Sequence, residues 1–188
     1  MATVEGPRRH RHVVRWLSCG VALVLVVVAV VAATRPNNEA ASFDSPLIGH
    51  HAPPLSAHDF AGQLVSLQRD RGNVVIVNFF GSWCPPCQTE EPNLAQLSFD
   101  LRRKHHPRIE LVSVDIDDST PGARQFVRLW HITWPAVPDH AGQYAAEFGV
   151  TGPPMTFFID PHGVVVGVLS GPATYEQLAA GVTAAQND

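Results

Sequence analysis

The sequence predicts an α/β domain with a central mixed sheet flanked by helices. Residues 74–80 form an apolar run interrupted only by Asn78, which is typical of a strand buried on both faces. A helical segment and a second apolar strand over 109–114 follow, and this order indicates two parallel strands joined by a right-handed helical crossover. The chain has 188 residues, of which 45% are hydrophobic and 16% charged, so it is long enough for one domain, predicted over 47–188, and a short additional segment.

The N-terminal segment is expected to be a membrane anchor. Four arginines lie within residues 1–15, and an uncharged run rich in Val, Leu and Ala follows over 16–33, nearly long enough to span a bilayer. The arginines predict a cytoplasmic tail over 1–15 and a domain outside the cell. A cleaved signal peptide, which would leave the domain secreted, is the alternative, because residues 31–33 suit a signal peptidase. The polar residues 34–46 are predicted to form a flexible tether.

Periodicity and turn residues define the remaining elements. Residues 47–67 predict an N-terminal extension with a short hairpin that turns at 59–62. Beyond the central strand we expect a helix to about residue 104, kinked at Pro92, and a closing helix capped by Thr174. Between these two helices the sequence predicts strands at 109–114, 134–139, 155–159 and 164–169 and helices at 121–131 and 140–148.

Two cysteines stand directly after the central strand, in the sequence WCPPC. Pro85 and Pro86 suit the first turn of a helix, so Cys84 and Cys87 are expected at a helix N-terminus, where free N–H groups favour a thiolate on the more exposed Cys84. Half of a zinc site is one alternative, but the chain has no second CxxC or HxxxH pair to complete it. A structural disulfide is another, but so short a loop contributes little stability. Redox chemistry is therefore the preferred interpretation.

The chain resembles the thioredoxin superfamily in two motifs. These are WCPPC with Pro92 five residues beyond it, and the segment GVTGPPMTFFID over 149–160. Within the superfamily, the sequence over 48–182 is similar to the membrane-anchored, extracytoplasmic TlpA/ResA/CcmG-like thiol-disulfide oxidoreductases. The additional strand and helix expected at 134–148 resemble the insertion of the TlpA-like branch. The resemblance therefore implies a thioredoxin-like fold with a TlpA-type insertion.

The resemblance also implies a substrate-binding loop. It aligns Pro154 with the cis-proline that packs against the CxxC motif, so Pro153, Pro154 and Met155 are expected to offer backbone groups to a substrate chain. Pro153 has no N–H to donate, which predicts weaker or differently shaped peptide recognition than in relatives. Trp83 is expected to shield one side of the disulfide.

In the chemistry that the resemblance implies, Cys84 attacks a target disulfide and Cys87 resolves the mixed disulfide. Thioredoxin itself uses a buried aspartate as proton acceptor, and Asn78, which cannot titrate, takes that position here. Glu90 is the expected acceptor, because the ResA-like branch carries an active-site glutamate three residues after the second cysteine. Glu91 is expected to face solvent. The redox-active Cys84–Cys87 pair replaces a cofactor.

The branch resemblance implies a reductase that receives electrons from a membrane thiol donor. Its substrates would be protein disulfides or dithiols, among them the haem-binding cysteines of apocytochrome c. An oxidase of exported proteins is the main alternative. A Sco-like copper chaperone would use Cys84, Cys87 and a distant histidine such as His162. A peroxiredoxin would need threonine three residues before its reactive cysteine, where this chain has Gly81.

The net charge and the acidic cluster after the second strand bear on binding partners and metal sites. The formal net charge of −4, with four arginines in the N-terminal tail, makes the domain acidic, so nucleic acid and anionic lipid are unfavourable partners. Asp115, Asp117 and Asp118 lack the glycine and distal glutamate of a calcium loop. They are expected to form a solvated turn and helix cap, and no metal site is predicted.

Overall fold

The chain divides into two units, residues 1–37 and 38–188. The computed structural model describes residues 21, 23–26, 40–103, 108–116 and 118–187. Residues 21 and 23–26 are helical, whereas the rest of the predicted anchor at 16–33 and the tail at 1–15 lie outside the described residues. In the described part of the chain, no helix has both the length and the apolar character needed to cross a membrane.

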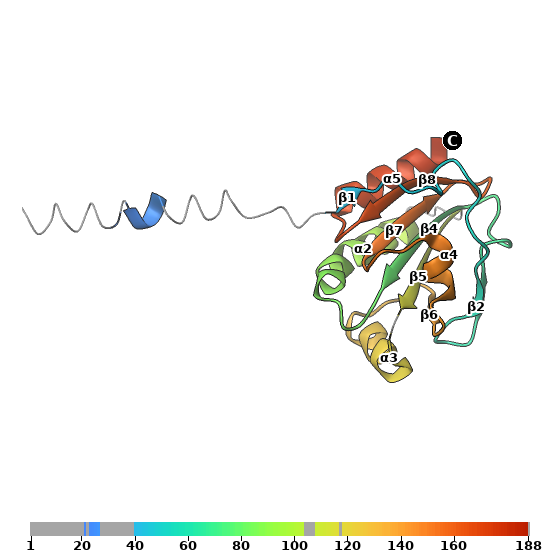
Figure 1. The fold of residues 1–188 in the computed structure, drawn as a ribbon, viewed down its shortest axis with the longest axis horizontal. Helices are drawn as coiled ribbons and strands as arrows, with labels where there is room; N and C mark the ends of the chain where they lie inside the picture. Colours follow the sequence, from blue (N-terminus) through green and yellow to red (C-terminus); the bar gives the residue numbers. More distant parts are fainter. Residues whose placement is uncertain (1–20, 22, 27–39, 104–107, 117, 188) are drawn as a thin grey trace, which may run out of the picture. The chain divides into compact units, whose positions relative to one another are not determined.

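A six-stranded mixed sheet forms the centre of the second unit (Figure 1). Its strand order is β1-β8-β7-β4-β5-β6. The strands are β1 (Ala41–Ser42), β4 (Val74–Phe80), β5 (Ile109–Ile116), β6 (Ala136–Asp139), β7 (Met155–Ile159) and β8 (Val165–Ser170). β5 is parallel to β4 and β6, whereas β7 is antiparallel to β4 and β8. The predicted α/β fold with a mixed sheet is confirmed, and β4 and β7 have their predicted bounds.

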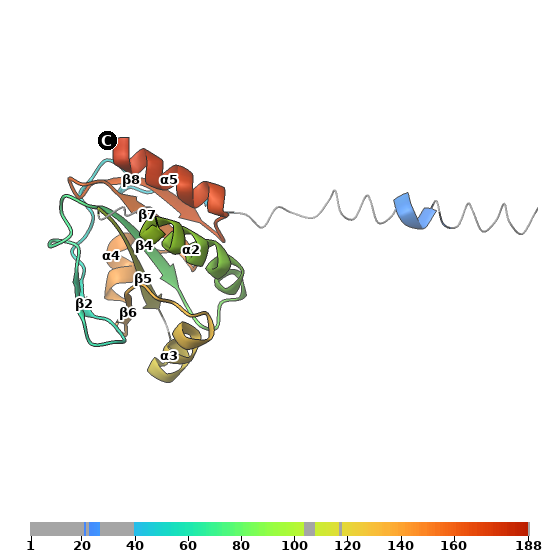
Figure 2. The same ribbon diagram turned by 180° about the vertical axis from the view of Figure 1, so that it is seen from behind.

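Helices and the hairpin cover the two faces of this sheet (Figure 2). The helices are α2 (Pro85–Arg103), α3 (Thr120–Leu129), α4 (Gln143–Phe148) and α5 (Tyr175–Asn187). Alternation along β4 sends Val74, Ile76 and Phe80 into one apolar cluster, which also contains side chains of α2, α3 and α5. Val75, Val77 and Phe79 enter a second cluster with Phe148 of α4 and Val65 of the hairpin. Asn78 therefore lies on the face covered by α2.

The N-terminal extension forms the predicted hairpin. Its strands are β2 (Ser56–His58) and β3 (Leu64–Ser66), which pair in antiparallel register. The Asp59 carboxylate fixes the turn, because its Oδ1 accepts from the N–H groups of Ala61 at 2.9 Å and Gln63 at 2.7 Å.

The segment predicted as a tether over 34–46 is tied to the sheet in its described part. β1 pairs with β8, and the N–H groups of Ala40 and Phe43 donate to the carbonyls of Pro172 at 2.8 Å and Val168 at 2.9 Å. Composition did not indicate this, because a two-residue edge strand is held by backbone hydrogen bonds that any side chain permits.

β5 continues two residues beyond its predicted end, which changes the environment of the acidic turn. Asp115 pairs with Phe80 on one side and Pro138 on the other and is 2% exposed, so the expectation that it is solvated is wrong. The pairing with β4 and β6 continues beyond Val114, the last residue of the apolar run of β5, and this extends β5. The N-cap of α3 is Ser119, whose Oγ accepts from the N–H of Gly122, and not one of the described aspartates 115 and 118 as predicted; Asp117 lies outside the described residues.

Candidate active site

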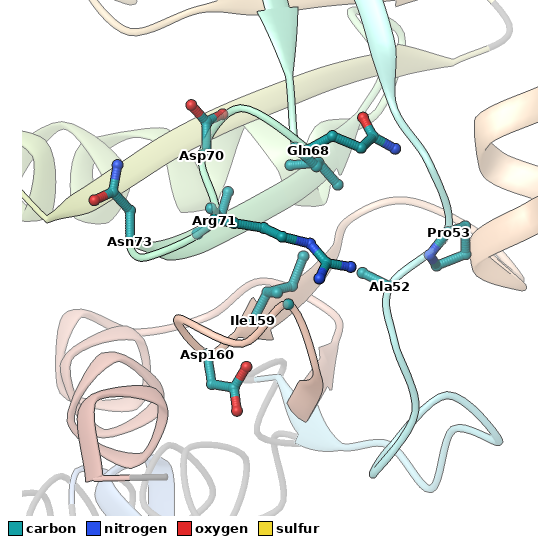
Figure 3. A pocket seen from close by; sticks show the side chains of 11 residues that line it. Ala52, Pro53, Gln68, Asp70, Arg71, Asn73, Ile159 and Asp160 are labelled. Carbon is teal, nitrogen blue, oxygen red and sulfur yellow. The ribbon is translucent and has the colours of Figure 1, made fainter.

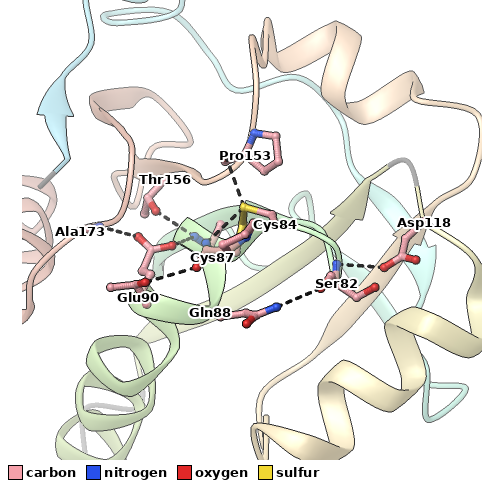
Figure 4. Close-up of a disulfide and its surroundings, with 12 residues drawn as sticks. Ser82, Cys84, Cys87, Gln88, Glu90, Asp118, Pro153, Thr156 and Ala173 are labelled. Atoms are coloured by element: carbon pink, nitrogen blue, oxygen red, sulfur yellow. Dashed lines mark hydrogen bonds between the residues drawn. A yellow bond between two sulfur atoms is a disulfide. The ribbon is translucent and has the colours of Figure 1, made fainter. Parts of the chain in front are cut away.

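The CxxC motif lies where β4 passes into α2 (Figure 4). α2 begins at Pro85, as predicted, and Cys84 and Cys87 are joined by a disulfide at its N-terminus. The Cys87 N–H points at Cys84 Sγ over 3.1 Å. In the reduced protein this donor and the positive end of the helix dipole stabilise a thiolate on Cys84.

Exposure does not distinguish the two cysteines as expected. Cys84 is 2% exposed and Cys87 1%, so in the disulfide form both are buried. The cover over Cys84 is the loop before β7, whose Pro153 carbonyl oxygen lies 3.6 Å from Cys84 Sγ. This is a van der Waals contact, because a disulfide sulfur has no proton to donate. The Cys87 N–H that points at Cys84 Sγ therefore indicates Cys84 as the expected nucleophile better than the exposed fractions of the two cysteines do.

The loop over the disulfide contains the expected cis peptide bond, between Pro153 and Pro154. The Pro154 carbonyl is already occupied, since it accepts from the Gly171 N–H at 2.9 Å. Met155 is fully buried, and its sulfur accepts from the Thr151 N–H at 3.4 Å. Of the three loop residues predicted to bind substrate, only Pro153 keeps a backbone acceptor beside the disulfide.

Trp83 lies on the surface next to the motif and is 53% exposed. Its indole packs close to the end of β4, and a Cβ added to Gly81 would lie 2.8 Å from the indole Nε1. Glycine is therefore required at position 81 for this placement of the ring. The exposed ring offers an apolar surface beside the disulfide.

Glu90 lies behind the disulfide and is 1% exposed (Figure 4). Its Oε2 accepts from Asn78 Nδ2 at 2.9 Å, and its Oε1 accepts from the Ala173 N–H at 3.0 Å. Burial raises the pKa of Glu90 to about 7, against the lowering effect of hydrogen bonds from Ala173, Asn78 and Thr156. A carboxyl group with this pKa exchanges a proton readily at neutral pH. Sequence reasoning anticipated Glu90, but not Ala173 and Thr156.

Glu91 is not on the surface, and the expectation that it faces solvent is wrong. It is 2% exposed, and neither carboxylate oxygen has a hydrogen-bond partner. Burial and then the charge of Glu90 raise the pKa of Glu91 to about 8. The buried stripe of α2 explains its position, because Glu91 lies four residues after Cys87 and three before Leu94, both of which are buried.

Asp118 also reaches the active-site loop, which sequence reasoning missed. Its Oδ2 accepts from the Ser82 N–H at 2.9 Å, so the carboxylate holds the loop between β4 and Cys84. Asp118 lies beside the buried Asp115, whose pKa is raised to about 8 by burial and then by the charges of Asp118 and Asp139. The position of Asp118 just after a strand parallel to β4 was the available signal, because such strands end at the same edge of a sheet.

The opposite end of β7 is remote from this chemistry. A cavity of about 30 Å³ lies there among Arg71, Asp160 and Gly163 (Figure 3), with room for roughly one water. His162 is in the same turn, at the end of β7 away from Pro154, so it does not join the cysteines as the copper alternative requires. Across the described residues, no three His, Cys, Asp or Glu side chains are arranged to hold a metal ion.

Together, the fold and the disulfide at the start of α2 define a thioredoxin-like thiol-disulfide oxidoreductase. ResA, a thiol-disulfide oxidoreductase of Bacillus thuringiensis, is 31% identical to this chain over 131 residues, which are 70% of this chain and 74% of ResA. The chain belongs to the AhpC/TSA family, whose sequence model matches residues 48–168, and within it to the TlpA/ResA/CcmG-like branch.

Solved structures agree with this assignment. A putative thiol:disulfide interchange protein DsbE of Chlorobium tepidum has a TM-score of 0.65 and 28% identity, covering 72% of this chain and 94% of its own. DsbF of MTB, solved in mixed oxidised and reduced forms, has a TM-score of 0.63 and 31% identity, covering 70% of this chain and 95% of its own. The predicted family is therefore confirmed.

Proposed function

We propose that this oxidoreductase is an extracytoplasmic disulfide reductase in which Cys84 is the nucleophile, Cys87 the resolving thiol and Glu90 the proton acceptor. The observation that carries the proposal is Glu90, a buried carboxyl group with a pKa of about 7, one helical turn beyond Cys87. A resolving thiol shielded from water needs such an acceptor on its own side of the disulfide.

The reaction transfers two electrons to the target. The Cys84 thiolate attacks one sulfur of a target disulfide, and the other target sulfur leaves as a thiolate. Cys87 loses its proton to Glu90 and attacks Cys84 Sγ, which releases the second target thiolate and leaves the Cys84–Cys87 disulfide. Solvent protonates the two target thiolates, and Glu90 later returns its proton. The target disulfide is reduced and the enzyme dithiol is oxidised.

Substrate recognition in this proposal depends on one acceptor and one apolar surface. The Pro153 carbonyl beside Cys84 accepts an N–H from an extended substrate chain, and the exposed Trp83 ring covers the flanking side chains. Pro153 cannot donate in return and the Pro154 carbonyl is bound to Gly171, so the backbone pairing is limited to a single hydrogen bond. This supports substrates with exposed, flexible cysteines rather than a long docked strand.

The substrate class proposed is the haem-binding cysteine pair of apocytochrome c, with a membrane thiol donor that returns the enzyme to its dithiol form. The similarity to ResA and the predicted anchor at 16–33 support this assignment. A tether at the membrane keeps the disulfide within reach of a membrane-embedded donor.

The experiment that tests the proposal is covalent trapping in the membrane. The full chain with Cys87→Ser cannot resolve its mixed disulfides, so substrates remain attached to Cys84 and are identified by mass spectrometry. The matched control carries Cys84→Ser as well. Apocytochrome c among the specifically trapped proteins supports the proposal. Secreted enzymes that normally contain disulfides, together with a strongly oxidising reduction potential, would instead identify an oxidase.

A further inference from the structure

Glu91 is a buried acid that the proposed mechanism does not use. Its carboxyl group lies on the buried stripe of α2, and both of its oxygens lack hydrogen-bond partners, whereas Glu90 accepts at both of its oxygens. Side chains four residues apart on a helix are about 6 Å apart at Cβ, so Glu91 is a direct neighbour of Cys87. Two carboxyl groups and the resolving thiol therefore share one buried region.

Among the described residues, no cation compensates these groups. The charge that acts on Glu91 is that of Glu90, and like charge disfavours a second ionisation. Arg124 of α3 is engaged elsewhere, since it donates to the Phe60 carbonyl at 2.7 Å and lies over the Phe60 ring. On α5, Tyr175 donates to Asp100, about 13 Å further along α2 than Glu91. Each negative charge added behind the disulfide therefore opposes the next.

We infer that Glu91 is a positioning residue for the redox reaction, whose proton sets how many negative charges lie behind Cys87 and thereby limits thiol resolution at alkaline pH. The inference rests on the proposed role of Glu90. With Glu91 protonated, Glu90 is the charged member of this pair of carboxyl groups and accepts the Cys87 proton. Once Glu91 ionises, the thiolate of Cys87 forms beside an uncompensated charge, and Cys87 becomes a weaker acid.

The structure indicates the pH at which this change occurs. Burial and the Glu90 charge place the pKa of Glu91 at about 8, so Glu91 is neutral at pH 6 and ionised at pH 9. A full charge on a side chain next to Cys87 disfavours the Cys87 thiolate, and one pKa unit of this effect makes Cys87 about tenfold weaker as an acid. Removing that charge should accelerate resolution at pH 9 but not at pH 6.

The resolution step can be timed in the full chain. Reduced protein is mixed with Ellman's reagent, in a Cys19→Ser background so that only the active-site thiols react. Cys84 releases a first coloured thiolate, and Cys87 releases the second when it resolves the mixed disulfide. For Glu91→Gln we expect a second-phase rate equal to that of the parent at pH 6 and about tenfold faster at pH 9. Glu147→Gln, at an exposed site on α4, should match the parent at both pH values.

Two further variants make the result decisive. Glu91→Leu also removes the charge, so its ratio of second-phase rates between pH 9 and pH 6 must equal that of Glu91→Gln. If Glu91→Gln resolves at the same rate as the parent at both pH values, the charge has no effect and the inference is overturned. If both Glu91 variants are slowed equally at both pH values, Glu91 has a packing role and the inference is overturned as well. The Glu90→Gln variant distinguishes a failure of the Glu91 inference from a failure of the proposed function. If Glu90→Gln leaves resolution unchanged at pH 7, the proton-acceptor role fails, whereas slow resolution there with no effect of Glu91→Gln overturns the Glu91 inference alone.

Discussion

Replacing Glu90 by glutamine should stabilise the folded protein at neutral pH while slowing resolution. In the folded state the pKa of Glu90 is raised from 4.5 to about 7, chiefly by burial. Between these values the folded protein holds a proton that the unfolded chain has released, so the free energy of unfolding falls as pH rises and is constant again above pH 7. At about 1.4 kcal/mol per pKa unit, Glu90 lowers stability by about 3 kcal/mol between pH 4.5 and pH 7.

Glutamine removes this pH dependence because it cannot ionise. Its carbonyl can still accept from Asn78 or from the Ala173 N–H, so one of the two hydrogen bonds survives and the loss at low pH is about 1 kcal/mol. The assay is urea unfolding of the oxidised protein at pH 4.5 and pH 8. The difference in unfolding free energy between variant and parent should shift by about 3 kcal/mol in favour of the variant on going to pH 8.

Glu147→Gln, at an exposed site, controls for the loss of a charge and should show no such shift. The effect of burial on the pKa of Glu91 is present in both proteins and cancels, whereas the variant also removes the Glu90 charge that raises this pKa, which changes stability in the same direction. A difference between variant and parent that is the same at pH 4.5 and pH 8 would refute the reasoning, because it would mean that Glu90 has an ordinary carboxyl pKa.

Three further changes test the surroundings of the disulfide. Thr156→Val removes a hydrogen bond that lowers the pKa of the acceptor carboxyl group, so the midpoint of the pH profile for resolution should rise by about one unit in stopped-flow measurements. Asp118→Ala should accelerate amide exchange of Ser82 about tenfold in NMR spectra, whereas Asp118→Asn keeps the acceptor and should not. Gly81→Ala forces a Cβ to 2.8 Å from the neighbouring indole, so tryptophan fluorescence should change and stability should fall by about 1–3 kcal/mol. Unchanged profiles, exchange or fluorescence would contradict these contacts.

Local sequence signals predicted the core of the fold and the position of the disulfide. β4 was predictable because an apolar run ends at Gly81 and is followed by two prolines that suit a helix start. β7 was predictable for a related reason, since its apolar run begins directly after Pro154 and ends before Asp160. In both cases the information lies within a few residues of the element.

The sequence did not predict β1 or the burial of Asp115 and Glu91, because these features depend on segments from elsewhere in the chain that pack against them. β1 exists because β8 offers a free edge to a polar segment. Asp115 is buried because Phe80 of β4 and Pro138 of β6 pair with it on its two sides. Glu91 was judged by its angle from Glu90, whereas its burial depends on the width of the α2 surface that the rest of the domain covers. A charged residue at such a position looks like a surface residue until the covering elements are known.

The distribution of hydrogen-bond donors determines which of the two buried glutamates ionises first. Glu90 receives donors from Asn78, Ala173 and Thr156, and these favour its charged form, whereas Glu91 receives none and also feels the charge of Glu90. Near neutral pH the first negative charge therefore forms on Glu90, the group held by both the central strand and the segment before α5. Because Glu91 ionises only at higher pH, the region behind Cys87 changes by one charge at a time, and the carboxylate that is fixed in place is the one available to take the thiol proton.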